Sequence, residues 1–337
     1  VGSIAATGFG LTALCIGAER GWLPRADART RVHRTLTTFA RDVPTVRGWF
    51  YHWLDIDSGA RAWKSELSSI DTALLLGGVI TAARAWRADA GIGRLAARIL
   101  DRIDWAWMLD GHPTLLSHGW YPERGFITNR WDHYSELLLL YVLGLGARQA
   151  PLPSASWRAW SRPVTEYAGL VYVGRVPPLF VHQFSHAWID FRGWRDPQAP
   201  HDWHDNSVRA TRAHRQFCID LGREFPGCYG PDLWGLTASD TRTGYKAWGG
   251  PPRTPDIDGS VVPCARIYGR YGFADAFHPV DGWTNPDVIG IDLGITLLAA
   301  ENLRSGRVWR WTMAHPQVTR GLQRAGLGLK GASQISL

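Results

Sequence analysis

The chain is almost without lysine. Lys64, Lys246 and Lys330 are its three lysines among 37 basic residues, so arginine supplies nearly all of the formal charge of +7. The arginines are scattered and form no run of like charge, whereas a nucleic-acid-binding surface usually appears as a basic cluster or stripe. We therefore expect no nucleic-acid partner.

Cysteines and long apolar runs are also scarce. The four cysteines show neither a CxxC motif nor paired metal-ligand spacing. Cys218 and Cys228 could pair in an oxidising compartment, and the sequence leaves that disulfide open. No stretch approaches the roughly 18 apolar residues of a membrane-spanning helix, so no span is expected. No signal peptide is visible, but residues 1–23 are already helical in pattern, which suits a chain whose leader has been removed.

Several common functional motifs are missing or fail on context. There is no GxSxG, so a serine hydrolase of the nucleophile-elbow type has no support. Residues 326–331, GLGLKG, match GxGxxG but follow no strand and open no helix, which predicts a C-terminal loop. Residues 55–59, DIDSG, begin like a calcium loop but lack its later ligands. They predict a turn, although Asp55 could still line a cleft.

Tryptophan, in contrast, is abundant, with 19 residues beside 10 tyrosines and 11 phenylalanines. A flat ring flanked by hydrogen-bonding side chains suits the apolar faces and polar rim of a sugar, although each ring alone is better explained as a core residue with a wet edge. Taken as a set, the rings predict a carbohydrate cleft. The tryptophans beside Gly, Asp, His or Arg are Trp49, Trp53, Trp63, Trp120, Trp131, Trp188, Trp194, Trp203, Trp234, Trp248 and Trp283.

Helical periodicity recurs along the chain without βαβ alternation, sequence repeat or obvious linker. We therefore predict a single all-α domain over residues 1–337, with paired helices around a centre and long loops shaping a cleft at one end. Short hairpins are expected in 48–55 and 118–130. Helices are predicted at 3–18, 27–42, 66–88, 92–108, 133–148, 155–168, 207–223, 287–304 and 307–313, with a further turn or helix at 181–189.

Carboxylates placed among aromatic residues are candidates for catalysis. Glu136 lies at the polar start of a strongly apolar helix, where Asp132 could cap the helix and leave Glu136 free beside Trp131 and Tyr134. Asp275 lies in an irregular aromatic loop. Two carboxyl groups facing each other across a cleft can act as acid and base in glycosidic cleavage, and capping or turn roles explain them about equally well. Further candidates are Glu66, Asp71, Asp240, Asp258 and Asp292.

Residues 179–196, LFVHQFSHAWIDFRGWRD, carry three potential metal ligands at intervals of four. In a helix His182, His186 and Asp190 would share one face. The pair lacks the glutamate of HExxH and any third histidine, so we favour a metal-free site without a cofactor. Ring faces alternating with hydrogen-bonding groups predict a wall that binds sugar. Its members are His182, Gln183, His186, Trp188, Asp190 and Arg192.

Seven ordered segments together resemble the glucoamylase-like family, which includes endo-β-1,2-glucanases and the cyclisation domains of cyclic β-1,2-glucan synthases. The resemblance runs from about Ser3 to Leu327. The segments are ELSSIDTALLLGG, YSELLLLYVLGLG, HQFSHAWIDFR, WGLTASD with GYKAWGGPP, DGSVVPCA, YGFADAF and IGIDLGITLLAAENLRSGRVW.

The resemblance implies an (α/α)6 barrel and inverting hydrolysis of β-1,2-linked glucan or its oligosaccharides, in a periplasmic or secreted bacterial protein. By motif, the glutamate of YSE is Glu136, the general acid, and the aspartate of YGFADAF is Asp275, the base acting on water. Beyond the wall described above, the substrate-binding residues are expected to be Asp55, Glu66, Asp71, Trp131, Tyr134, Trp234, Asp240, Tyr245, Asp258 and Asp292.

Three departures from the family pattern leave specificity open. The usual IDQGP is IDLGI here, serines replace an acidic cluster in KSELSSIDTA, and Ala265 adjoins Arg266 where a further helix is expected. Linkage, chain length and endo or exo action therefore stay open, as does the oligomeric state. A transglycosylase, a non-catalytic carbohydrate-binding protein and a metal hydrolase remain alternatives.

Overall fold

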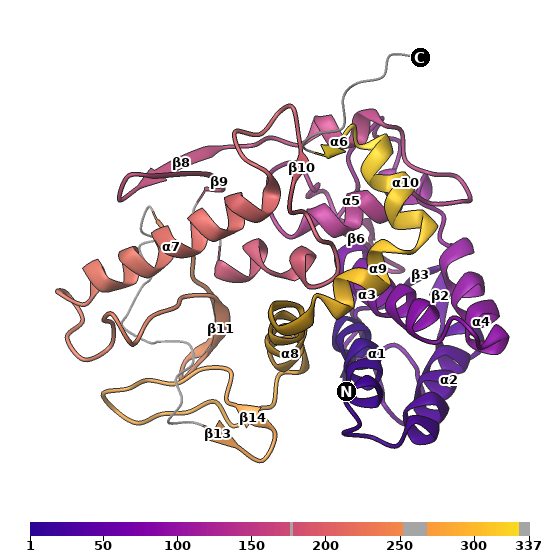
Figure 1. The fold of residues 1–337 in the computed structure, drawn as a ribbon, viewed down its shortest axis with the longest axis horizontal. Coiled ribbons are helices and arrows are strands. Elements are labelled where there is room, and N and C mark those ends of the chain that lie inside the picture. The colour runs from indigo at the N-terminus through magenta and orange to yellow at the C-terminus, as the bar shows by residue number, and fades with distance from the viewer. Residues whose placement is uncertain (176–177, 252–267, 330–337) are drawn as a thin grey trace.

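The computed structural model describes residues 1–175, 178–251 and 268–329. It is mostly helical with small sheets, which agrees with the predicted class (Figure 1). The α-helices are α1 (Ile4–Glu19), α2 (Arg25–Arg41), α3 (Ser69–Ala85), α4 (Ala90–Asp101), α5 (Leu137–Leu145), α6 (Ala155–Ala159), α7 (Trp203–Leu221), α8 (Gly290–Ser305), α9 (Arg307–Met313) and α10 (Pro316–Arg324). Short 3-10 helices are η1 (Trp107–Leu109), η2 (Leu179–His182) and η3 (Phe184–Ala187).

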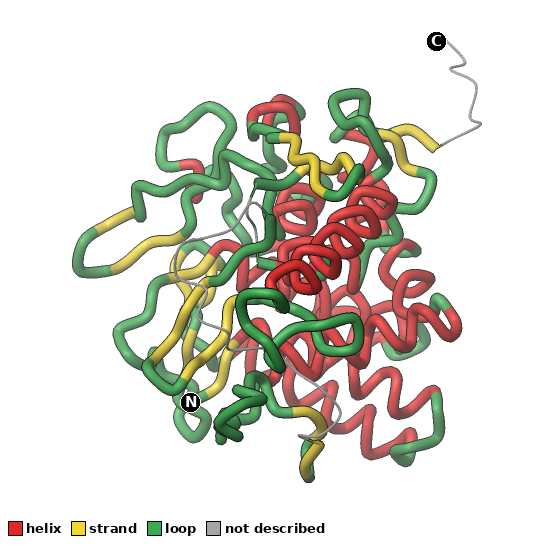
Figure 2. The backbone as a smooth tube through the Cα atoms, turned by 90° about the vertical axis from the view of Figure 1, so that its left-hand side faces the viewer, coloured by secondary structure: helices red, strands yellow, loops and turns green. Residues whose placement is uncertain are grey.

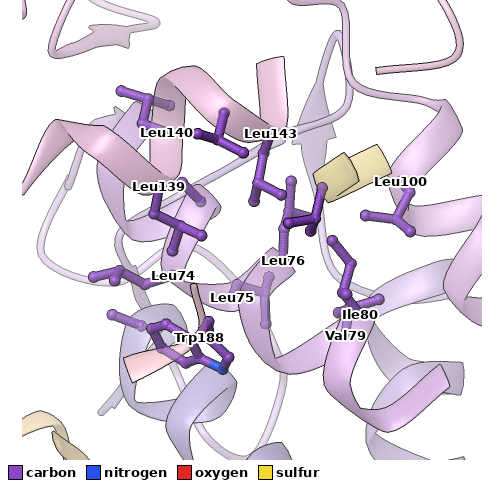
Figure 3. Close-up of a cluster of buried hydrophobic side chains, with 14 of the residues drawn as sticks. Leu74, Leu75, Leu76, Val79, Ile80, Leu100, Leu139, Leu140, Leu143 and Trp188 are labelled. Carbon is purple, nitrogen blue, oxygen red and sulfur yellow. The ribbon is translucent and has the colours of Figure 1, made fainter. Parts of the chain in front are cut away.

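Helix α3 occupies the centre of the core and contacts α1, α4, α5 and α9. It begins at Ser68, whose hydroxyl accepts a hydrogen bond from the Asp71 amide at 3.2 Å. Its leucines meet those of α5, a helix that is apolar on every side and therefore wholly buried (Figure 3). Helices α1 and α3 touch through glycine: a Cβ on Gly78 would lie 2.1 Å from the Gly8 carbonyl oxygen.

The strands form short antiparallel pairs outside this core, and Figure 2 shows most of the long loops to one side of the helices. The pairs are β1 (Gly2–Ser3) with β4 (Trp53–Leu54), β2 (Thr45–Val46) with β3 (Trp49–Phe50), β8 (Val164–Tyr167) with β9 (Leu170–Val173), β10 (Trp194–Arg195) with β15 (Gly328–Leu329), β11 (Ala238–Thr241) with β12 (Gly244–Ala247), and β13 (Tyr268–Gly269) with β14 (Gly272–Phe273). A three-stranded sheet contains β5 (Leu67–Ser68), β6 (Gly119–Tyr121) and β7 (Gly125–Phe126).

Most predicted elements are confirmed, and the errors have local causes. The hairpin predicted in 118–130 forms as β6 with β7, whereas the one predicted in 48–55 was wrong, because β3 pairs with β2 and β4 pairs with β1. The last predicted helix, 307–313, has the bounds of α9. The helix predicted at 155–168 ends at Ala159, because the β-branched residues after Pro163 pair as β8 with β9. Helix α10 was not predicted; it begins at Pro316, which is favourable at the first helical position and only looks like a helix breaker. The helices predicted at 92–108 and 133–148 are shorter, ending at Asp101 and beginning at Leu137.

Two further expectations from the sequence concern cysteines and membranes. Cys218 and Cys228 are both buried in one cluster with Phe217 and Leu221 but are not joined to each other by a disulfide. In the parts of the chain that the structure describes, no helix is long and apolar enough to cross a membrane.

Candidate active site

Glu136 stands immediately before α5, and its side chain is not used to cap that helix. The cap comes instead from Ser185 of η3, whose hydroxyl donates to the Glu136 carbonyl at 2.7 Å and accepts from the Leu139 amide at 3.0 Å. The predicted cap was wrong: the Asp132 carboxylate is exposed and lies 2.6 Å from His133. The capping by Ser185 leaves the Glu136 carboxyl free for chemistry.

The Glu136 carboxyl has a raised pKa. Burial raises its pKa to about 7, a backbone hydrogen bond opposes that rise, and the negative charge of Asp71 adds to it. At neutral pH a large share of this carboxyl is therefore protonated. A protonated carboxyl whose side chain does not cap a helix can act as a general acid.

Asp71 belongs to a group of three that we call the His52 cluster: His52, Glu66 and Asp71. The His52 ring places Nδ1 2.9 Å from Glu66 and Nε2 3.5 Å from Asp71. Tyr121 donates its hydroxyl to the second Glu66 oxygen at 3.5 Å, and the Ser68 hydroxyl donates to Asp71 at 2.5 Å. The imidazole therefore bridges two carboxylates that enter from the loop before α3 and from its first turn.

The members of the His52 cluster shift one another's pKa values. Burial alone would lower the pKa of His52, but the Glu66 hydrogen bond and the charges of Asp71 and Glu66 raise it overall. Burial would likewise raise the pKa of Glu66, yet its contacts with His52 lower it. For Asp71 burial dominates and the pKa is raised. The cluster thus favours the cationic form of His52 between its two acids.

A second group, the Asp275 cluster, contains Asp240, Asp275 and Asp292. Asp275 follows β14 and is 7 % exposed, and its carboxylate accepts from Asn285 Nδ2 at 3.2 Å. A hydrogen bond joins the carboxyl groups of Asp275 and Asp292, and the Asp240 backbone also donates to Asp275. Asp292 lies in the first turn of α8. Like the members of the aspartic-protease pair, two buried carboxyls in contact cannot both ionise freely.

The two carboxyls of this pair share one proton, and the directions of their pKa shifts favour Asp292 as its holder. Burial raises the pKa of both carboxyls, but their hydrogen bond lowers that of Asp275 and raises that of Asp292. These directions favour a hydrogen bond from a protonated Asp292 to an ionised Asp275. An ionised carboxylate held by two or three donors is suited to the role of a general base.

Tyr245 shows that the two halves of the chain meet at one site. It lies on β12 opposite Asp240 of β11, and the residue is 68 % exposed. Burial of its hydroxyl raises the pKa, and the charges of Glu136, Asp240, Asp275 and Asp292 raise it further. Coulombic effects weaken with distance, so the four carboxylates lie near enough to Tyr245 to act on one hydroxyl.

A cavity of about 270 Å³ opens beside the Asp275 cluster. Its lining includes Gln183, Trp234, Asp275 and Asp292, which come from η2–η3, the loop before β11, the loop after β14 and α8. Four residues predicted separately from sequence are therefore brought together. Leu293 and Ile295, which replace the polar residue and the proline of the family pattern, also line this cavity.

Several predicted substrate-binding residues are instead buried behind the site. Trp188 is fully buried, and its indole donates to Thr12 in the core. Trp131 donates to Ser69 at 2.8 Å, and the Tyr134 hydroxyl lies 3.1 Å from His182 Nδ1. The His186 ring contacts Ser207 at 2.8 Å. Trp131, Tyr134 and Trp188 therefore support the wall of the cleft, whereas His182 and the half-buried His186 line a second cavity of about 520 Å³ together with Gln183.

Other predicted residues lie away from the cluster. Asp190 and Arg192 form a two-point ion pair in a groove beside α9, with the guanidinium over Trp309. Asp55 accepts from the backbone of Asp57 and Ser58 and closes its own turn, as a purely structural aspartate would. Asp258 and the junction between residues 265 and 266 lie outside the described residues.

His182, His186 and Asp190 do not form a metal site in the described chain, because the segment forms two 3-10 helices and the two rings have separate partners. Burial lowers the pKa of both histidines to about 3, so they are neutral. Within the described ranges, the group with metal-ligand spacing is the His52 cluster, whose ligand atoms lie within 4.8 Å of one another. Within this group His52 Nδ1 is hydrogen bonded to Glu66, and Nε2 forms an ion pair with Asp71 at 3.5 Å.

Sequence reasoning missed His52 and the role of Ser185. His52 lies between β3 and β4, and it is brought to Glu66 by the bridge between Tyr51 and Leu67 and by the hydrogen bond from its own amide to the Glu66 carbonyl at 2.9 Å. Its one local signal was the aromatic surround of WFYHWLD. For Ser185 no local signal exists, because its target is more than 40 residues away in sequence.

Comparison with known proteins decides the family. The model of the "Putative glucoamylase" family matches residues 128–267 and 265–316, more than half of the sequence. The chain belongs to this family. The resemblance to the glucoamylase-like family that the sequence predicted is therefore confirmed.

Individual relatives are distant but nearly complete over this chain. An exo-β-1,2-glucooligosaccharide sophorohydrolase (non-reducing end) from Parabacteroides distasonis is 23% identical over 383 residues, covering 95% of this chain and 52% of the relative. The chain thus spans about half the length of that curated relative. A Bacteroides caccae structure described in the same words as the family is 26% identical with a TM-score of 0.87, covering 97% of this chain and 89% of that one.

An endo-β-1,2-glucanase from Chitinophaga pinensis has also been solved with sophorotriose and glucose. Its TM-score to this chain is 0.87 at 24% identity, with 97% of this chain and 88% of that one covered. At that identity the similarity shows a shared fold.

Proposed function

We propose that this protein is a glycoside hydrolase that cleaves β-1,2-linked glucan or its oligosaccharides. The observations that carry the proposal are the buried Glu136 carboxyl left free by the Ser185 cap and the cavity lined by Asp275 and Asp292, all three of which act on the pKa of Tyr245. They join a carboxyl with a raised pKa to an ionised carboxylate in one site, the pair that glycosidic cleavage needs. The β-1,2-glucan activities of the Parabacteroides and Chitinophaga relatives support the choice of linkage.

In this proposal Glu136 protonates the glycosidic oxygen as the leaving sugar departs. Asp275 accepts a proton from the attacking water, and Asp292 keeps Asp275 ionised by donating a hydrogen bond to it. Attack by water in one step inverts the anomeric centre. Gln183, Trp234 and Tyr245 contact the sugar from the cavity side, and the His52 cluster receives sugar hydroxyls from the other side, next to Asp71 and Glu136.

Three further parts of the proposal concern the whole molecule. The helices form an (α/α)6 barrel with the long loops around one end, the chain acts as a single catalytic domain, and the protein works in the periplasm or after secretion. The agreement in fold over nearly the whole of several solved relatives supports the first two.

The test is a substrate panel of β-1,2-glucan, laminarin, cellulose and starch, with new reducing ends measured over time. We expect reducing ends from β-1,2-glucan alone, and proton NMR of the first product should show the α-anomer. Product release from starch instead, or binding of β-1,2-glucan without any cleavage, contradicts the proposal. Size analysis of the products then separates endo from exo action and hydrolysis from transglycosylation.

A further inference from the structure

A groove rich in arginine lies far from the candidate active site. It has a volume of about 940 Å³ and is bounded by the start of α2, the end of α3, the start of α4 and α9. Of its fourteen lining residues six are arginine, whereas arginine makes up about one in ten residues of the chain. We call it the arginine groove; its arginines are Arg25, Arg29, Arg84, Arg87, Arg307 and Arg310.

The groove and the active site lie at opposite ends of α3. Asp71 is in the first turn of this helix and Arg84 in its last. Thirteen residues at about 1.5 Å each separate them by about 20 Å along the axis. A ligand in the groove would therefore not touch Glu136 or the His52 cluster.

Carboxylates in the described chain balance only part of this charge. Asp89 lines the groove and pairs with Arg29 at 2.5 Å, while it also caps α4 by accepting from two backbone amides. Glu19 pairs with Arg307 at 2.8 Å. Among the described residues, the ion pairs at the groove do not extend to the other four arginines, which leaves a net positive recess.

The unpaired guanidinium groups are partly preorganised. Arg25 lies over the Trp86 ring at 4.4 Å, and Arg310 donates to the Ser305 carbonyl at 2.5 Å. The Nε atoms of Arg84 and Arg307 are buried without a hydrogen-bond partner among the described residues. A buried donor without a partner costs free energy, and a ligand acceptor would remove that cost.

Helix electrostatics do not explain this gathering. Arg84 in the last turn of α3 suits the negative end of that helix, but Arg25 is the first residue of α2, where a positive charge is unfavourable. Holding several guanidinium groups together against their mutual repulsion is expected where they serve an anion. Their planar donor sets match phosphate oxygens in pairs.

We propose that the arginine groove binds a soluble phosphate-bearing molecule. A recess with walls from four elements suits a compact ligand, whereas a flat lipid surface would not reach the arginines at its base. The volume exceeds that of one phosphate group, and the partly buried Trp311 offers a ring face to the rest of such a molecule. The proposal is independent of the glycosidase activity.

The experiment is isothermal titration calorimetry of the full chain with inorganic pyrophosphate in a phosphate-free buffer. We expect saturable binding that weakens as salt is raised. In the Arg25→Gln/Arg87→Gln variant, which changes two exposed side chains, the Kd should rise about tenfold or more, because charged hydrogen bonds are lost. Arg310→Gln is a second variant on another helix and should weaken binding in the same direction.

The matched control is Arg158→Gln/Arg223→Gln, which removes the same charge from exposed sites that do not lie on the helices around the groove. It should bind pyrophosphate like the parent. Equal weakening in the control, or no binding by the parent, overturns the proposal. Co-sedimentation with phosphatidylglycerol vesicles in the absence of pyrophosphate binding also overturns it and assigns the groove to lipid instead. Hydrolysis of β-1,2-glucan should be unchanged in every variant, so failure here is distinct from failure of the proposed activity.

Discussion

The two sides of the candidate active site compensate the charge of their buried carboxyl groups in different ways. In the His52 cluster a cation stands between Glu66 and Asp71, so both acids gain a partner of opposite charge. In the Asp275 cluster the described residues that shift Asp275 and Asp292 include carboxyls and amide donors but no cation. The first side balances charge, whereas the second can only share a proton.

This difference separates binding from catalysis. A balanced cluster is stable and offers fixed hydrogen-bonding groups, which suits recognition of sugar hydroxyls. A pair of carboxyl groups without a cation shares one proton and one negative charge, which suits proton transfer. The pKa of Glu136 is raised by burial and by the charge of Asp71.

The largest expected effect comes from removing the two proton-transfer groups. Glu136→Gln and Asp275→Asn should each lower kcat/KM on β-1,2-glucan by about 100- to 10,000-fold, the usual worth of a positioned acid or base. Asp132→Asn is the matched control, because Asp132 is exposed and close in sequence to Glu136. Near-parental rates in either variant, with an unchanged circular dichroism spectrum, would remove that residue from the mechanism.

The next effect tests the shared proton through stability. Because folding raises the pKa of Asp292, the folded state binds a proton more tightly than the unfolded one. Stability is therefore lost as pH rises from the unfolded value of about 4 toward the raised value. Asp292→Asn cannot ionise, so it should raise the melting temperature at pH 7.5 by about 2 °C or more and flatten the dependence on pH. A variant that melts lower at pH 7.5 than the parent contradicts the proton assignment. Activity should fall at the same time, because Asp275 loses its acidic hydrogen-bond donor.

The third prediction removes the cation of the other side. The pKa of His52 is raised in the fold, so its stabilising contribution is complete below the unfolded value of about 6.5 and is lost as pH rises through the folded value. His52→Gln should therefore destabilise the protein at pH 5.5, by on the order of 1 kcal/mol, and by less at pH 8.5. Urea unfolding at the two pH values measures the difference. An equal loss at the two pH values would show that the stacking of His52 on Trp53, with ring centroids 4.6 Å apart, outweighs the charge.

Sequence reasoning found the parts of the site that lie on motifs and missed those created by folding. Glu136, Asp275 and Asp292 could be named because each lies in a short segment of family pattern. The contribution of His52 depends on the pairing of strands only two residues long, for which local propensity gives little information. Helix α10, which was also not predicted, has only nine residues, too few for a clear helical pattern.

The histidine-rich segment shows why residue type alone misled the prediction of contacts. Its alternation of rings and polar groups resembled a sugar wall, yet Trp188 fills the core against Gly77 and Ser185 caps α5. Burial of a ring depends on which helix passes above it, and that is a property of the tertiary fold. Of that segment, Gln183 is the predicted residue that lines the cavity beside Asp275.

The smallest expected effect concerns the link between the two sides. Asp71→Asn removes a negative charge that raises the pKa of Glu136, so the acid should lose its proton at a lower pH. The alkaline limb of kcat/KM, which follows the free enzyme, should therefore move toward acid, while the acidic limb set by Asp275 stays in place. The shift is small because burial is the main cause of the raised pKa, and because His52 already offsets the charge of Asp71. A pH profile of Asp71→Asn against that of Asp132→Asn isolates the effect from general loss of charge. If both limbs move together, Asp71 acts by holding the substrate. If the alkaline limb moves toward base, the charge of Asp71 does not raise the pKa of Glu136.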